Sequence, residues 1–211
     1  MSDRLPSLRG VTHLYATGVA LAAATVLVAL AQSATARAAA AVYGAGLCAL
    51  FGGSALYHRW RWDARWRPLL RRIDHSAIFV FIAATYTPVA LLVLRGPLRI
   101  VVLAVVWAGA IAGVTLSVAW IGAPRVLVAC CYVALGWVAV IAMPQLAAAL
   151  PATPLVLLAA GGILYTLGAG VYATRRPDPW PTVFGFHEVF HAFVIAAAAA
   201  HYVALAGWVV G

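Results

Sequence analysis

The chain has 211 residues, of which 65% are hydrophobic and only 9% are charged, and its formal net charge is +9. A soluble domain averages about 25% charged residues, so this composition excludes an ordinary water-soluble protein. All the basic side chains other than histidine are arginines that lie between apolar runs, which argues against nucleic-acid binding and favours orientation in a bilayer.

Seven apolar runs are each long enough to cross a hydrocarbon core of about 30 Å. In chain order they are residues 11–32, 38–58, 73–94, 98–121, 124–143, 152–173 and 184–210. Clusters of arginine, glycine and proline separate several of them, as helix-breaking loops require. The sequence therefore predicts an all-α membrane protein in which residues 1–211 form a single seven-transmembrane helix bundle.

The first run is followed by Ala34-Thr35-Ala36, which resembles a signal-peptide cleavage site. The apolar region of a signal peptide is typically about 7–15 residues long, and this run is longer. We therefore expect the first run to be retained as a membrane span.

The arginines are unevenly divided between the two sides of this topology. Eleven of the 14 lie on the side of the N-terminus, including Arg4, Arg9 and the six from Arg59 to Arg72. The positive-inside rule then predicts a cytoplasmic N-terminus and an outside C-terminus in the cell inner membrane. Three tryptophans lie among the six arginines, so we interpret residues 59–72 as an interfacial loop that contacts anionic lipid headgroups.

Ionisable side chains inside membrane spans are costly and usually functional. His58 ends the second run, Asp74 begins the third, and His187 and His191 begin the seventh. The predicted topology places all four at the cytoplasmic ends of their helices and at similar depth. Isolated histidines of this kind often only pair with backbone carbonyls, but their shared depth favours a metal site.

The spacing of His187 and His191 puts both imidazoles on one helix face, one turn apart, as a shared metal requires. Catalytic zinc usually takes three protein ligands and leaves a fourth position for water, so His58 is the natural third ligand. Ser54, one turn before His58, could orient a ligand or the water. Asp74 could accept a hydrogen bond from the water and act as general base.

The run from His187 to His191 is also a literal H-E-x-x-H, which raises the alternative of an intramembrane metalloprotease with Glu188 as base. Such enzymes usually take a third ligand from downstream, and no acidic residue follows Glu188. His201 lies ten residues beyond His191, roughly 15 Å along a continuous helix, and cannot reach the same ion. The protease interpretation is therefore the weaker one.

At these positions the chain resembles the bacterial hemolysin III family, within the wider progestin and adipoQ receptor family of seven-span proteins. The resemblance extends over essentially the whole chain. It is carried by Thr12-His13, Ser54 to His58, Arg72 to Ile78, Ala84 to Pro88, and His187 to His191 with His201 beyond. It implies that zinc is held by His58, His187 and His191, that Asp74 bonds the zinc water, and that Ser54 is the motif serine. It also implies a relation to alkaline ceramidases, which are membrane hydrolases of lipid amides.

The leading functional hypothesis is zinc-dependent hydrolysis of a lipid amide or ester bond near the cytoplasmic leaflet. The alternative is a non-enzymatic receptor or membrane-homeostasis protein with a structural zinc. A pore-forming hemolysin is less favoured, because the spans have few polar residues to line a pore. We expect His13, His75 and His201 to line the interior or to bond between helices rather than to bind the metal.

Overall fold

The computed structural model describes residues 6–210, which form eight α-helices, one π-helical turn and short loops. The helices are α1 (Val11–Leu30), α2 (Ala34–Arg59), α3 (Arg67–Leu92), α4 (Gly96–Ala119), α5 (Arg125–Gly136), α6 (Ala139–Ala149), α7 (Ala152–Thr174) and α8 (Phe186–Ala204), followed by the π-helical turn Leu205–Val209. Because α5 and α6 form one span, seven segments of the described chain are long and apolar enough to cross a membrane. The predicted seven-helix bundle is confirmed.

The helices begin where local chemistry satisfies their first backbone amides. The hydroxyl of Ser33 caps α2 by accepting a hydrogen bond from the Ala36 amide at 3.0 Å. Prolines occupy the first turns of α3 and α4, where the missing N–H costs nothing. Gly10 precedes α1 with a φ of 73°, and a side chain there would collide with the backbone at His58 and Arg59. Gly10 thus brings the start of α1 against the end of α2.

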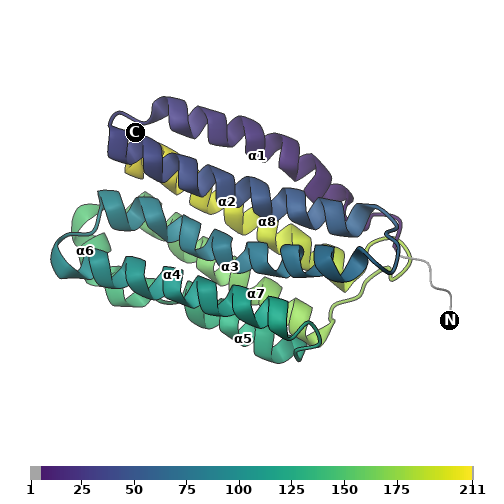
Figure 1. Cartoon of the computed structure of the whole chain (residues 1–211). Helices are drawn as coiled ribbons and strands as arrows, with labels where there is room; N and C mark the ends of the chain where they lie inside the picture. The colour runs from purple at the N-terminus through teal and green to yellow at the C-terminus, as the bar shows by residue number, and fades with distance from the viewer. Residues whose placement is uncertain (1–5, 211) are drawn as a thin grey trace.

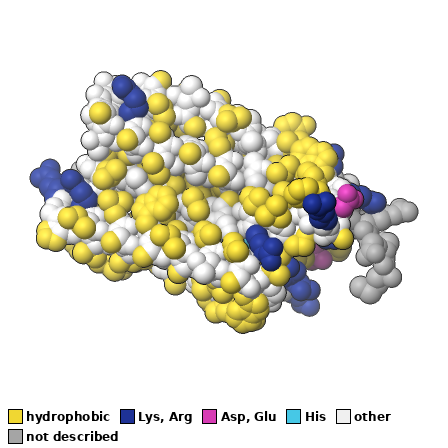
Figure 2. Space-filling view, in the orientation of Figure 1, with side chains coloured by type: hydrophobic (Ala, Val, Ile, Leu, Met, Phe, Trp, Pro, Cys, Tyr) yellow, Lys and Arg dark blue, Asp and Glu magenta, His cyan; other side chains and the backbone are white. Residues whose placement is uncertain are grey.

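The helices lie side by side, and the start of α1 and the end of the last helical turn lie at opposite ends of the bundle (Figure 1). Helix α2 packs against α1 and α3, α3 against α4, and α7 against α5 and α8. Large apolar side chains, among them Val19, Ile100, Ile111 and Val156, are exposed on the outside. Arginines gather towards the two ends of the surface, with an apolar and uncharged region between them (Figure 2). This is the surface that a bilayer requires.

The third span begins six residues earlier than the predicted residue 73. Arg67, Arg71 and Arg72 therefore belong to α3 and not to a loop, because arginine is a good helix former and Pro68 favours a helix start. The Arg72 Nε atom donates a hydrogen bond to the Val118 carbonyl at 3.1 Å, near the end of α4. The predicted interfacial loop is thus shorter and ends at Trp66.

The fifth span is interrupted in its middle and continues to Ala149, beyond the predicted residue 143. At the break, the Tyr86 hydroxyl donates a hydrogen bond to the Gly136 carbonyl and accepts one from the Ala139 amide at 2.7 Å. A side chain from α3 thus satisfies backbone groups that the break would leave unpaired inside the membrane. Pro144 did not end the span, because such a proline is tolerated where neighbouring groups satisfy the backbone.

The orientation of the bundle in the membrane stays a prediction, and Arg4, which contributes to the arginine count, lies outside the described residues. We expect a reporter enzyme that is active only outside the cytoplasm to be active when fused after Gly211. The same reporter inserted between Arg61 and Arg65 is expected to be inactive, because that segment carries the arginine excess. If the inserted reporter is active and the C-terminal fusion is inactive, the orientation in the membrane is the opposite of the predicted one.

Candidate metal centre

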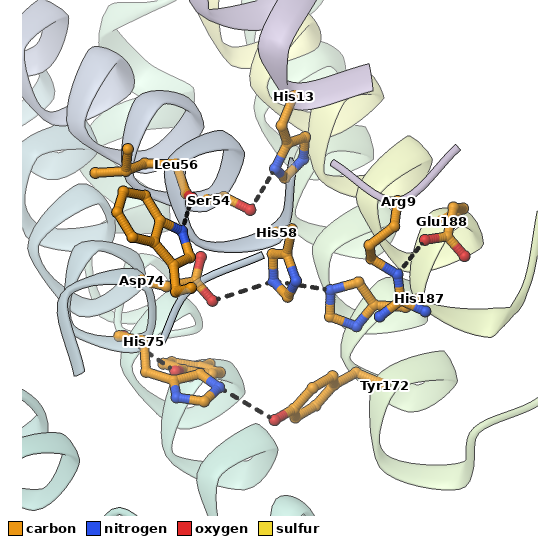
Figure 3. Close-up of polar contacts among 12 residues, drawn as sticks. Arg9, His13, Ser54, Leu56, His58, Asp74, His75, Tyr172, His187 and Glu188 are labelled. Carbon is orange, nitrogen blue, oxygen red and sulfur yellow. Dashed lines mark hydrogen bonds and ion pairs between the residues drawn. The ribbon is translucent and has the colours of Figure 1, made fainter. Parts of the chain in front are cut away.

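Three histidines from two helices meet at the end of the bundle where α1 begins. His58 lies in the last turn of α2, and His187 and His191 lie in the first two turns of α8. Each offers a ligand atom within 4.8 Å of those of the other two. The Nε2 atoms of His58 and His187 are 3.2 Å apart (Figure 3). The structure therefore brings together all three residues predicted as metal ligands.

The spacing of these nitrogens fits a metal of the predicted kind. Two nitrogens, each about 2.05 Å from a tetrahedral zinc, stand roughly 3.3 Å apart, close to the His58–His187 separation. His191 is 2% exposed, and its Nδ1 atom has no hydrogen-bond partner among the described residues. A buried imidazole nitrogen without a partner is costly unless something binds it. The three histidines could thus hold one metal ion.

Asp74 stands beside the cluster, in the second turn of α3. Its side chain is nearly buried, and its Oδ2 atom lies 3.4 Å from the Nε2 atom of His58 (Figure 3). The structure therefore places the predicted general base next to a predicted ligand. A carboxylate in this position can accept a proton from a group bound beside His58.

Ser54 contacts the cluster indirectly, through His13, which was not among the predicted residues of the metal site. Its hydroxyl lies 2.8 Å from the Nδ1 atom of His13, on α1. The His13 ring in turn stacks on the ring of His191, with centroids 3.6 Å apart and an interplanar angle of 6°. Ser54 and His13 thus hold the orientation of His191 from the side away from α8. One sign of this contact is present in the sequence, since His13 is an ionisable residue near the start of the first span.

Glu188 faces away from the histidine cluster and has two structural contacts. Its Oε1 atom pairs with the Nε atom of Arg9 at 2.6 Å, and its Oε2 atom accepts a hydrogen bond from the Gly185 amide at 2.9 Å (Figure 3). The second contact caps the start of α8. Glu188 is fully buried. The acid of the H-E-x-x-H motif therefore connects the start of the chain to α8.

The two other conspicuous histidines bond between helices, as expected. The Nε2 atom of His201 lies 3.0 Å from the Leu158 carbonyl on α7. The Nε2 atom of His75 lies 3.4 Å from the Tyr172 hydroxyl, and the His75 carbonyl accepts a hydrogen bond from Tyr132 at 3.1 Å. Neither residue belongs to the three-histidine group.

The histidine cluster lies at one end of a large apolar cavity of about 210 Å³. His13, Ser54, Asp74, His187 and His191 line that end. From there the cavity extends between α3, α6, α7 and α8, past apolar side chains, as far as the opposite end of the bundle. Several lining residues are exposed on the outside of α6 and α7, namely Val140, Met143 and Ala159. The cavity is thus polar at the end beside the histidines and apolar along the rest of its length, and it borders the outer surface at α6 and α7.

Comparisons with known proteins cover nearly the whole chain. A family model described as "Haemolysin-III related" matches residues 3–202. Hemolysin-3 of Bacillus cereus is 34% identical over 158 residues, which are 75% of this chain and 69% of that protein. Hemolysin-3 homolog of Bacillus subtilis (strain 168) is 33% identical over 159 residues, 75% of this chain and 71% of that protein. The human monocyte to macrophage differentiation factor is 28% identical over 201 residues, 92% of this chain and 80% of that protein.

Proposed function

This chain belongs to the haemolysin-III-related family of multi-pass membrane proteins, and from that premise we propose that it is a zinc-dependent hydrolase of a lipid amide or ester bond. The observation that carries the proposal is the position of the three-histidine group at one end of the apolar cavity, which His187 and His191 line. A hydrolytic metal needs a polar site, and a lipid needs an apolar space beside it. The cavity supplies both within one continuous volume.

In such a reaction, the residues around the cluster have different roles. His58, His187 and His191 would hold zinc, which supplies a Lewis acid and an activated water when bound. Asp74, at 3.4 Å from His58, takes up the proton released as the lipid carbonyl is attacked. The apolar lining beyond the cluster holds the acyl chain and keeps bulk water away from the carbonyl. His13 and Ser54 keep His191 in its orientation.

One observation favours a second function, a receptor or membrane-homeostasis protein with a structural zinc. The 3.4 Å between Asp74 and His58 is also a spacing that two ligands of one metal adopt. With Asp74 as fourth ligand the site is closed and has no position for a nucleophile. The two functions therefore differ in the fourth coordination position of the zinc, which is open in the hydrolase and filled by Asp74 in the receptor.

The test is a product assay with purified protein in lipid nanodiscs. The nanodiscs contain an N-acyl lipid and a diacyl phospholipid, and released fatty acid is measured by mass spectrometry. We expect fatty acid release by zinc-loaded protein, loss of release after chelation, and recovery when zinc is restored. Folded, zinc-loaded protein that releases no fatty acid from either lipid would favour the receptor.

A further inference from the structure

Seven arginines of α2, α3, α5 and the loop between α2 and α3 lie at the metal-centre end of the bundle and differ in exposure. Exposed arginines lie at the end of α2, in the loop that follows and at the start of α3, namely Arg59, Arg61, Arg65 and Arg67. Arg71, Arg72 and Arg125 are partly buried between helices. Arg72 has a structural partner in the Val118 carbonyl. Within residues 6–210, the ion pairs are Arg9–Glu188 and His58–Asp74, so neither Arg71 nor Arg125 has an acidic partner there.

The guanidinium of Arg125 stacks on two aromatic rings. Its Cζ atom lies over the Tyr172 ring at 5.7 Å from the centroid and over the Phe186 ring at 5.8 Å. Stacking on aromatic rings uses the flat face of a guanidinium and leaves the N–H groups of its edge available. The Nη1 atom is buried and has no hydrogen-bond partner among the described residues. A buried donor attached to a charge requires an acceptor.

A small cleft of about 20 Å³ lies between α3, α4, α5 and α7. Its polar lining comes from Arg71, His75, Ser117 and Tyr172. His75 and Tyr172 also line the large cavity, so this pair, joined at 3.4 Å (Figure 3), forms the wall between the two spaces. Arg125 does not line the cleft, but it stacks on the ring of Tyr172, which does. Through Tyr172, the cleft and Arg125 both adjoin the large cavity.

We propose that Arg71 and Arg125 bind the phosphate group of a lipid whose apolar chain enters the large cavity. The inference rests on the proposed function for the position of the reacting bond, and it defines the substrate class as phosphate-bearing lipids. Arg71 and Arg175 lie close enough to Arg125 to repel it, and a bound phosphate offsets that repulsion. The cleft has room for about one water-sized group, hence one phosphate oxygen, while the other oxygens stay at the membrane surface.

A lipid is favoured over free phosphate because of what surrounds the two arginines. Both belong to membrane-spanning helices, Arg71 one turn from the start of α3 and Arg125 at the start of α5. An apolar cavity lies directly behind the wall formed by His75 and Tyr172. A ligand with phosphate and apolar chain joined in one molecule gains from both features, whereas free phosphate gains from only one.

Binding is measured with three probes that this protein cannot cleave. The protein is kept in an uncharged detergent and its thermal unfolding midpoint is recorded against probe concentration. The probes are the dioctyl-ether analogue of phosphatidic acid, the matching dioctyl-ether glycerol without phosphate, and inorganic phosphate. We expect saturable stabilisation by the first and at least tenfold weaker binding of the other two. Equal binding of the phosphate-free lipid, or of inorganic phosphate, would overturn the proposal.

Variants of the two arginines locate the site. Arg71→Gln and Arg125→Gln are each expected to weaken binding of the phosphate-bearing ether lipid about tenfold or more, since each removes a charge-assisted contact. Arg67→Gln, an exposed change one turn away on α3, is expected to alter it less than about twofold. Equal losses for all three would indicate diffuse charge attraction and refute the site.

A second variant of Arg125, and a comparison of lipid binding with lipid turnover, complete the test. If Arg125→Gln does not fold, Arg125→Lys keeps the charge but loses the two-pronged donor geometry, and it should still bind the probe several-fold less tightly. Unchanged binding by Arg125→Lys would contradict the assigned geometry. Because ether lipids are not hydrolysed, binding without any turnover would refute the hydrolase alone. Turnover of N-acyl or ester lipids without phosphate-dependent binding would refute this inference alone.

Discussion

Replacing His187 by alanine is expected to lower the zinc content of the purified protein from about one ion per chain to nearly none. The His187 ring lies 4.5 Å from the His58 ring and 4.4 Å from the His191 ring, and its Nε2 atom is 3.2 Å from that of His58. Loss of a residue that merely supports a ligand typically weakens zinc binding about 10–100-fold, so loss of the ligand itself should exceed that. Elemental analysis of detergent-purified protein, normalised to protein mass, measures the effect.

The same loss is expected for His58→Ala and His191→Ala. His201→Ala is the matched control, because it removes a partly buried histidine from the same helix without touching the cluster. His201→Ala should therefore retain its zinc. Wild-type protein that is folded after exposure to zinc and still carries no metal would remove the basis for the metal centre. Full zinc occupancy in all three ligand variants would place the ion elsewhere.

Replacing Asp74 by asparagine is expected to abolish lipid hydrolysis while most of the zinc is retained. The asparagine side chain has nearly the same shape but cannot take up a proton, and general-base catalysis contributes about 10²–10⁴-fold to a rate. Fatty acid release and zinc content are measured on the same preparation. Loss of zinc together with activity would instead identify Asp74 as a fourth ligand and support the structural-zinc alternative.

Glu188→Gln is the informative comparison for Asp74→Asn. Glutamine keeps the acceptor for the Gly185 amide but leaves the largely buried Arg9 without its counter-charge, which can cost about 3–5 kcal/mol of stability. We therefore expect a lower unfolding temperature and substantial hydrolysis per folded molecule. If Glu188→Gln is inactive and Asp74→Asn is active, the result supports the protease interpretation. If both variants keep the biological function of the wild type with zinc bound, neither acid serves as a catalytic base, and the receptor is favoured.

Much of the site could be predicted because its signals are local. Hydropathy over about 20 residues marks a span without knowledge of its neighbours. His187 and His191 share a face because of helical periodicity alone. The inclusion of His58 needed one further step, the alternation of seven spans across a membrane. That step placed the end of α2 and the start of α8 at the same depth, and the structure brings them into contact.

The contacts that depend on how helices pack could not be read from the chain. Nothing near Ser54 in the sequence indicates His13, because 41 residues separate the two and only the packing of α1 on α2 joins them. The hydrogen-bonding role of Tyr86 was hidden for the same reason, since the break that it satisfies lies on another helix.

The sequence by itself determined the number of spans, the arginine asymmetry and the residues able to bind a metal, since composition and helical period are properties of short segments. The tertiary structure alone decided what surrounds those residues. It assigned Glu188 to Arg9 and the start of α8, and it placed Arg125 over Tyr172 and Phe186. Such pairings depend on the relative position of helices distant in the chain, which packing of complete side-chain surfaces sets and local pattern does not encode.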